Sequence, residues 1–445
     1  MAGQADLDTC LDRGRMGPFQ GLVIVLCGLM VAIDGYNTQV IGLAAPAIAA
    51  AWHVAPAAFG SVFGLGLLGG TVGAVAFGGA GDRFGRKPVL LAAILLFAGV
   101  SLLTPFTHTI SALVIIRLIS GFGLGGALPG LVAITSDYAP KAVRAKVTGL
   151  MYCSFPLGSV LAGVISAQMI PSWGWGSVFY IGSLIPLILL PVFALVVPES
   201  ARFLALKGDK ARVAKVLARV NADVEWNGVV SSGAARASVA GLFANGRAPA
   251  TTLLWIALFL SLLLSVFMVS WVPLVARGAG IDVKSAVLAV SAWNIGGILG
   301  AFLIGRLSAR LGLVTTIGVA YAIGGAAVAV IGLSGQSGTV LLVASFIAGT
   351  FVIGAQMSII GLAASLYDSS QRGTGVGWAL GIGKLGSVVG PLLGGLMIGA
   401  GMSTTVLFGV AGLVSLATAI SVFGLGATSK PAPAPILTGS PPANG

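Results

Sequence analysis

The chain carries few charged residues, and this scarcity is the first constraint on its fold. Of 445 residues only 8% are charged, while 57% are hydrophobic and the mean hydropathy is +1.04. A soluble domain has about a quarter of its residues charged. The composition therefore excludes a soluble globular protein.

Cysteine and histidine are also scarce, with three and two residues in the whole chain. Cys10, Cys27 and Cys153 fall in segments expected in the cytoplasm or the membrane, so we expect no disulfide. His53 and His108 belong to outer loops and are expected to be solvated. The sequence has no cluster of metal-ligating residues and no kinase or phosphate-loop motif, which disfavours an enzyme or a sensor. We expect no metal and no cofactor.

Long apolar runs take up most of the chain, and each is long enough to cross a bilayer as a helix. We expect these spans at 20–42, 58–80, 88–106, 110–136, 144–168, 175–197, 251–276, 284–307, 313–334, 338–366, 374–400 and 402–426. The 67 glycines suit close packing of helices in lipid. The sequence therefore predicts an all-α integral membrane protein with about 12 transmembrane helices.

The net charge of +12 is distributed unevenly along these spans. One set of alternate loops holds Arg13, Arg15, Arg83, Arg86, Lys87, Lys141, Arg144, Lys146, Arg202, Lys207, Lys210, Arg212, Lys215, Arg219, Arg236, Arg247, Arg306, Arg310, Arg372 and Lys430. The opposite loops hold only Arg277 and Lys284. Basic loops mark the cytoplasmic side, so both termini are expected in the cytoplasm, at a bacterial-type cytoplasmic (inner) membrane. The basicity reflects topology, and we expect no nucleic acid partner.

No cleavable signal peptide is expected, because the first apolar run is too long and continues into the bundle. We divide the chain into a cytoplasmic tail (1–19), a six-helix half (20–197), a cytoplasmic loop (198–250), a second half (251–426) and a disordered tail (427–445). Apolar residues at helical spacing in the loop predict an amphipathic helix, either under the membrane or as a solvated linker. These residues are Val213, Val216, Leu217 and Val220.

The two halves repeat each other. "LGSVLAG" at 157–163 recurs as "LGSVVGP" at 385–391, and "SDYAPKAVRAK" at 136–146 recurs as "SLYDSSQRGTG" at 365–375. "GGAGDRFGRK" at 78–87 is echoed by "GRLSARLG" at 305–312 in nearly the same register. Such repeats are typical of transporters whose binding site lies at the midplane between the halves.

The glycine-flanked charges of the loop 78–87 resemble the signature loop of the major facilitator superfamily. Arg117-x-x-x-Gly121-x-Gly123-x-Gly125 resembles a second motif of that superfamily. The resemblance implies the major facilitator fold, with 12 helices in two pseudo-symmetric six-helix halves.

The signature loop also suggests a conformational latch, because Asp82 can pair with basic groups or cap the N-terminus of a neighbouring helix. The alternative is a charged turn that fixes topology. Ala309 replaces the acid in the second-half copy, which predicts a weaker latch there. The residues assigned to conformational gating are Gly78, Asp82, Arg83, Gly85, Arg86, Arg144, Arg310 and Arg372.

Four longer stretches resemble the aromatic acid:proton symporter family: "DGYNTQVIGLAAPAIA", "GLGGALPGLVAITSDYAPKAVRAK", "GLMYCSFPLGS" and "YDSSQRGTGVGWALGIGKLGSVVGPLLGG". The resemblance extends over residues 18–426. It implies import of a hydroxybenzoate-like or phenylpropionate-like carboxylate with protons by alternating access, with the proton gradient as energy source. Asn37 stands where that family has a second acid, Lys384 where it has arginine, and Asp368 where proline is common.

Only Asp34, Arg117 and Lys384 fall well inside the predicted spans. Ionisable residues within a membrane are costly and are functional candidates. From the helical rise, Asp34 lies roughly 20 Å from the cytoplasmic end and Arg117 roughly 10 Å from the outer end, which are matching depths. We assign proton coupling to Asp34 and Arg117; the alternative is a fixed structural ion pair.

Lys384 is expected near the middle of its span, where its charge would pair with a substrate carboxylate. The alternative is a side chain that extends to the interface. Further substrate-binding candidates are Tyr36, Asn37, Gln39, Tyr152, Asn294, Gln356 and Trp378, with Trp271 nearby. Each of these residues could instead only pack or bond one helix to another.

Two other transport activities stay open, efflux by antiport and import of another organic acid. The antiporter-type Gly-Pro signature belongs in the fifth span, where "GSVLAG" has no proline, and this favours symport. The expected partners are an aromatic carboxylate, protons and the lipid bilayer, and we expect a monomer.

Overall fold

The computed structural model describes residues 16–219, 226, 238–244, 246–368 and 371–428. Within these ranges, twelve helices are long and apolar enough to cross a membrane. The predicted all-α membrane fold is therefore confirmed. Most of the two predicted terminal tails, and Val220 and Arg236 in the central loop, lie outside the described residues.

The membrane-spanning helices form two groups of six. The first group is α2 (Pro18–Trp52), α3 (Phe59–Phe84), α4 (Arg86–Ser101), α5 (Ile110–Tyr138), α6 (Lys141–Trp173) and α7 (Gly176–Val196). The second is α10 (Ala248–Gly278), α11 (Val283–Leu311), α12 (Leu313–Ile331), α13 (Gly338–Leu366), α14 (Arg372–Gly399) and α15 (Thr404–Thr428). The short helices are α8 (Ala201–Leu206), α9 (Lys210–Arg219), η1 (Pro56–Ala58), η2 (Thr104–Phe106) and η3 (Val239–Phe243).

Both halves use the same helix pairings, as the internal repeat predicts. In the first half α2 packs on α6, α3 on α5 and α4 on α7; in the second, α10 packs on α14, α11 on α13 and α12 on α15. Between the halves, α3 meets α14, α6 meets α11, and α2 meets α10. Small residues let the paired helices approach closely. A side chain at Gly125 would overlap Gly70 of α3, and one at Gly300 would overlap Thr350 of α13.

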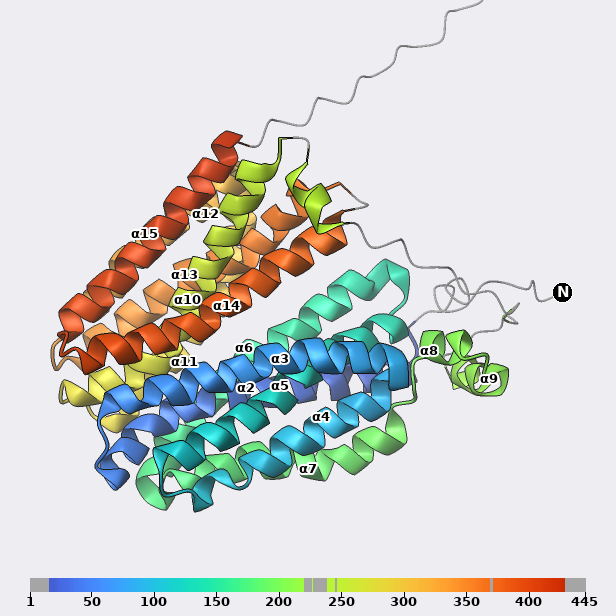
Figure 1. Ribbon diagram of the computed structural model, residues 1–445, viewed down its shortest axis with the longest axis horizontal. Coiled ribbons are helices and arrows are strands. Elements are labelled where there is room, and N and C mark those ends of the chain that lie inside the picture. The colour runs from blue at the N-terminus through green and yellow to red at the C-terminus, as the bar shows by residue number, and fades with distance from the viewer. Residues whose placement is uncertain (1–15, 220–225, 227–237, 245, 369–370, 429–445) are drawn as a thin grey trace, which may run out of the picture.

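The halves lie together at one end of the molecule and fan apart toward the other (Figure 1). We call the end where the halves separate the basic end, because Arg86, Lys141, Arg247 and Arg372 lie at helix ends there. The opposite end, where α2 and α14 finish, is called the far end. α8 and α9 lie at the basic end of the first half (Figure 1).

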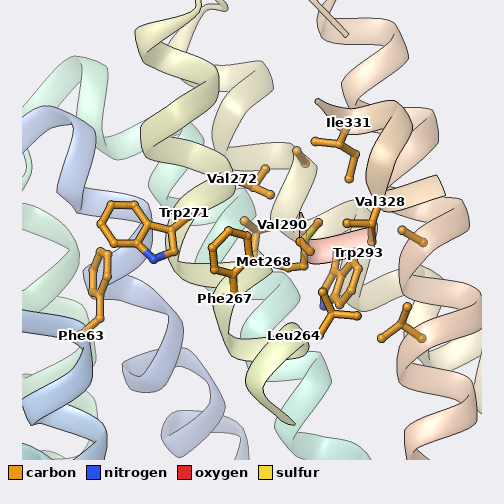
Figure 2. Packing of buried hydrophobic residues seen from close by; sticks show 14 of the residues in the cluster. Phe63, Leu264, Phe267, Met268, Trp271, Val272, Val290, Trp293, Val328 and Ile331 are labelled. Carbon is orange, nitrogen blue, oxygen red and sulfur yellow. The ribbon is translucent and has the colours of Figure 1, made fainter. Parts of the chain in front are cut away.

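Glycines and aromatic rings close the far end between the halves. Gly60 of α3 packs so closely on α14 that a Cβ atom there would lie 3.0 Å from the Cα atom of Gly395. Beside it, the rings of Phe63 and Trp271 meet edge to face with centroids 5.5 Å apart (Figure 2). The Trp271 indole also donates to the carbonyl of Pro391 at 3.2 Å. Trp271 is thus part of this closure.

The predicted amphipathic helix exists as α9, but it packs on the protein. Val213, Val216 and Leu217 are buried in the same hydrophobic cluster as Tyr138 and Phe193 of the first half. The helix packs on α8, and Arg219 at its end lies over the ring of Phe19 in α2. Its apolar side is therefore buried within the protein.

The other end of the central loop is fixed to the second half. Leu242 of η3 is fully buried, and its carbonyl accepts from the Thr251 hydroxyl at 2.8 Å. Arg247 donates to the Asp368 carboxylate at 2.6 Å and to the Gln371 side chain at 3.0 Å. The described parts of the loop therefore belong to different halves.

Cysteine cross-linking tests this arrangement. In a variant with Cys10, Cys27 and Cys153 replaced by serine, the pair Ala57→Cys and Gly399→Cys, which joins the start of the η1–α3 segment to the end of α14, should form a disulfide on mild oxidation. A Cβ atom at position 399 would lie 3.6 Å from the Cβ atom of Ala57, a separation that suits a disulfide. The matched pair Gly79→Cys and Gly377→Cys lies toward the basic ends of α3 and α14 and should cross-link more slowly. A shift in electrophoretic mobility measures both, and the reverse order of rates would contradict the observed closure.

Candidate functional site between the two halves

The middle of α2 holds four of the predicted site residues, Asp34, Tyr36, Asn37 and Gln39, and all four are buried. This burial follows from the position of α2, which contacts α5, α6 and α7 of its own half and α10 of the other half. The unusual polarity of this stretch therefore lies inside the protein and away from lipid. Its side chains differ in what they face.

Tyr36 and Asn37 face α7, within the first half. The Tyr36 hydroxyl donates to the carbonyl of Val178 at 2.9 Å. The Asn37 amide donates to the carbonyls of Ile33 at 3.0 Å and Gly182 at 2.8 Å. Both side chains thus tie α2 to α7 and point away from the second half, which leaves their predicted contact with substrate without structural support.

Arg117 reaches the same part of α2, but not Asp34. It is 6% exposed, and its guanidinium donates to the backbone carbonyl of Asn37 at 3.3 Å. The expected match in depth is therefore present, since Asn37 is one turn from Asp34. Among the residues that the structure describes, however, no ion pair joins Arg117 to Asp34, and the Arg117 Nε–H and the Gln39 side-chain oxygen are buried without a partner.

Asp34 and Lys384 of α14, from the other half, form no direct ion pair among the described residues either, but their opposite charges are close enough to influence each other electrostatically. The packing on α10 explains why these residues meet. Gly42 of α2 packs against the carbonyl of Val269, and Gly383 of α14 packs against Leu262. Asp34 lies eight residues before Gly42 in α2, and Leu262 lies seven residues before Val269 in α10. At about 1.5 Å per residue, both are about 11 Å from the contact between Gly42 and Val269. Lys384 follows Gly383, which touches Leu262, so Asp34 and Lys384 lie at nearly the same depth beside α10.

Tyr152 of α6 lies on the side of its helix that faces the boundary between the halves. At 100° per residue, the direction of Tyr152 around the axis of α6 lies between the directions of Ser159 and Gly163. Ser159 donates to the carbonyl of Gly35 in α2, and Gly163 packs against Ser291 in α11. Tyr152 is 46% exposed although it lies well inside α6. Its phenol can therefore reach a molecule held between the halves.

Gln356 and Asn294 are the polar candidates of the second half. Gln356 accepts from the Ser265 hydroxyl of α10 at 2.5 Å, which orients its amide group. Its amide nitrogen has no hydrogen bond within the described residues and remains a donor for a ligand. Asn294 is buried and donates to the carbonyl of Val290 in its own helix at 2.9 Å.

Trp378 lies outside this site. Trp378 precedes Lys384 by six residues, so the two side chains point in directions about 240° apart around the axis of α14. Trp378 lies on the same face of the helix as Leu385 and Leu396. All three side chains are largely exposed on the outside of the bundle, and Trp378 stacks on Trp255 with centroids 6.1 Å apart. The structure therefore does not bring Trp378 to Lys384.

The signature loop is part of a network at the basic end of the first half. Gly85 has a φ of +107°, and a side chain there would strike the Glu199 carboxylate. That carboxylate accepts from the backbone N–H groups of Arg86 at 3.0 Å and Lys87 at 3.2 Å, which caps α4. Arg86 in turn forms a 2.6 Å ion pair with Asp137 of α5.

Asp137 and Glu199 are functional candidates that the sequence analysis did not assign. Asp137 also accepts from the Ser200 hydroxyl at 2.5 Å, so these acids join α4, α5 and the start of α8. Asp137 lies in the repeated stretch "SDYAPKAVRAK", and Glu199 lies in "PESARFL", directly after the sixth span. Their role was hidden because the partners are about 50 to 110 residues apart in the chain.

Two further gating candidates of the signature loop, Asp82 and Arg83, form no ion pair among the described residues. Asp82 is exposed at the end of α3, with no hydrogen bond or ion pair among the described residues, and Arg83 covers the ring of Phe84. Open space surrounds Gly78. Of the remaining arginines, Arg144 donates to the Ala139 carbonyl, Arg372 donates to the Ala364 carbonyl, and Arg310 is exposed.

Comparison with known proteins agrees with this architecture. A family model described as the Major Facilitator Superfamily matches residues 27–359 and 253–443. The chain belongs to the Major Facilitator Superfamily. Its solved neighbours include the xylose transporter XylE from E. coli in a partially occluded inward open conformation, with a TM-score of 0.68, 17% identity and coverage of 91% of this chain and 97% of the other. The similarity to XylE concerns the fold alone.

Relatives with higher identity lie within the same superfamily. A gallate transporter of Pseudomonas putida is 34% identical over 95% of each chain, and a 4-hydroxybenzoate transporter of that species is 34% identical over 89% of this chain and 90% of its own. A 3-(3-hydroxy-phenyl)propionate transporter of Escherichia coli (strain K12) is 34% identical over 90% and 93%. The Major Facilitator chain described here is therefore a multi-pass membrane transporter and not an enzyme.

Asp82→Asn should slow the transport cycle several-fold without changing substrate affinity, because Asp82 lies at the basic end, far from Asp34 and Lys384. Transport rates in proteoliposomes and binding to purified protein measure the two effects. Asp282→Asn, at the opposite end, is the matched control: Asp282 caps α11 by accepting from Ser285 N at 2.9 Å, and an amide oxygen can do the same. A large loss of binding in folded Asp82→Asn would contradict a gating role.

Proposed function

We propose that this transporter imports an aromatic carboxylate together with protons by alternating access. The observation that carries the proposal is the presence of one acid, Asp34, and one cation, Lys384, at nearly the same depth on opposite sides of the boundary between the halves. The names of the relatives, which transport gallate, 4-hydroxybenzoate and 3-(3-hydroxy-phenyl)propionate, support the substrate class.

The basic end is the cytoplasmic side in this proposal, because positive residues are retained on that side of a membrane. α2 begins and α15 ends there, so both termini are cytoplasmic, and the membrane is the cytoplasmic (inner) membrane of a bacterial-type cell. Closure at the far end then makes this the inward-facing conformation. One chain supplies both halves of the site, and a monomer is sufficient for transport.

Lys384 binds the substrate carboxylate, and Asp34 takes up and releases the proton. Tyr152 and the oriented amide of Gln356 are placed to contact the ring and its hydroxyl groups. Tyr36, Asn37 and Arg117 act behind these residues by holding α2 against α5 and α7. The energy source is the proton gradient, and no metal or cofactor takes part.

The decisive experiment is uptake into proteoliposomes. Labelled gallate, 4-hydroxybenzoate and 3-(3-hydroxyphenyl)propionate are supplied with and without an acidic exterior. We expect at least one to be concentrated only when the pH gradient is present. Uptake of none of them, or accumulation driven by an opposite gradient, would contradict proton-coupled import of aromatic acids.

Asp34→Asn should abolish accumulation driven by a pH gradient, because the amide cannot exchange a proton. Exchange of labelled for unlabelled substrate should survive, since exchange moves no net proton. Asp282→Asn should accumulate substrate like the unaltered protein. If Asp34→Asn concentrates substrate normally, Asp34 is not the proton site.

Lys384→Gln should weaken carboxylate binding, while Lys384→Arg should largely preserve it. A hydrogen bond to a charged partner contributes about 1.5–3 kcal/mol, so the dissociation constant should rise roughly 10- to 150-fold. The amide analogue of the substrate should bind weakly to the unaltered protein and lose little further affinity in Lys384→Gln. Calorimetry on purified protein measures all four combinations. Equal losses for acid and amide would mean that Lys384 only supports its helix.

A further inference from the structure

The charges around Lys384 suggest how substrate and proton binding are linked. Among the described residues, the acid that interacts with Lys384 is Asp34, which is 5% exposed. α10, which packs against both α2 and α14, has no ionisable side chain from Ala248 to Ala276. The other acids on the helices around the pair, Asp82 of α3 and Asp137 of α5, lie at the basic end. Away from the helix ends, the other titratable or charged groups on α2, α5 and α6 include Arg117, Tyr36, Tyr152, Cys27 and Cys153, and none of these is a second carboxyl group.

In the empty site, the positive charge of Lys384 is therefore already balanced by Asp34. A substrate carboxylate brought to Lys384 would place two negative charges beside one ammonium group in a poorly hydrated place, where like charges repel strongly. Carboxylate binding and an ionised Asp34 oppose each other for this reason. Protonation of Asp34 removes the conflict, because it leaves Lys384 with the substrate as its counter-ion.

Asn37 matters for the number of protons. Its side-chain nitrogen donates to two backbone carbonyls, Ile33 O and Gly182 O, and an ionised carboxylate could not make either bond. The Asn37 amide therefore links α2 to α7 and does not change its charge with pH. Within the described middle of the bundle, Asp34 is the one carboxyl group that can change its charge.

We propose that ionised Asp34 balances the charge of Lys384 in the empty site and that the substrate carboxylate takes over this role, so that each carboxylate is bound with one proton and transport is electroneutral. The proposal rests on the function proposed above. The empty site holds one negative and one positive charge; the loaded site holds a protonated Asp34, the lysine cation and one substrate anion. Both have a net charge of zero, and the constant charge of Arg117 changes neither balance. One proton and one anion cross the membrane together and are released together.

Proton uptake on binding tests the linkage directly. Purified full-length protein is titrated with 4-hydroxybenzoate or gallate, whichever the liposomes accumulate, in buffers of different ionisation enthalpy. We expect about one proton taken up per carboxylate bound, and a dissociation constant that rises about tenfold per pH unit where Asp34 is ionised. Binding of the corresponding uncharged amide should take up no proton. Carboxylate binding without proton uptake would overturn the proposal.

Two variants separate Asp34 from other sources of protons. Asp34→Asn should bind the acid without proton uptake. At every pH its affinity should be at least as high as the highest affinity of the unaltered protein, which is reached where Asp34 is protonated. Asp282→Asn, an exposed acid at the far end, should take up the proton normally. Persistent proton uptake in folded Asp34→Asn would assign the linkage elsewhere. The pH dependence of the unaltered protein decides the question even if Asp34→Asn fails to fold.

Membrane potential tests the charge balance. In proteoliposomes, accumulation driven by a fixed pH gradient should not change when potassium and valinomycin impose a potential of either sign, and a potential alone should drive no accumulation. Accumulation that follows the potential would overturn electroneutral transport, while import driven by protons would still stand. Absence of any acid-driven accumulation would instead contradict the proposed function itself.

Discussion

A charge in the middle of a bilayer has to find water or an opposite charge, because hydrocarbon solvates neither sign. In this chain that requirement is met where the two six-helix halves face each other. Asp34 comes from one half and Lys384 from the other, and each interacts electrostatically with its counterpart. A change at either residue is therefore felt by both halves, as alternating access requires.

The two ends of the boundary are built differently. The far end is closed by backbone contact between Gly60 and Gly395 and by the rings of Phe63 and Trp271. These contacts are apolar and short in reach, so they can separate as a unit without leaving a buried charge unpaired. At the basic end the Arg86–Asp137 and Arg247–Asp368 ion pairs each lie within one half. Rigid halves that touch at one end can rock about their shared middle.

The repeat of the two halves is exact in helix pairing but not in chemistry. Gly85 and Gly312 both have a positive φ at the same kind of turn, at +107° and +88°. The first half surrounds its turn with Asp137 and Glu199, whereas the second half has Leu366 at the position of Asp137 and uses Asp368 to hold Arg247 of the central loop. The shared backbone geometry sets the fold, and the different charges give the halves different tasks.

Much of the architecture follows from the chain alone. Hydropathy marks the twelve spans, and the rise per residue places Asp34, Arg117 and Lys384 deep in the membrane, because both properties depend only on position along a helix. The face of Trp378 could also have been read from its six-residue distance to Lys384. Which helices become neighbours cannot be read this way. Contacts of Gly42 and Gly383 with α10 bring Asp34 to Lys384, while Arg117 stops at the Asn37 carbonyl. Those choices belong to the tertiary structure, because they depend on how side chains of distant segments pack around each helix.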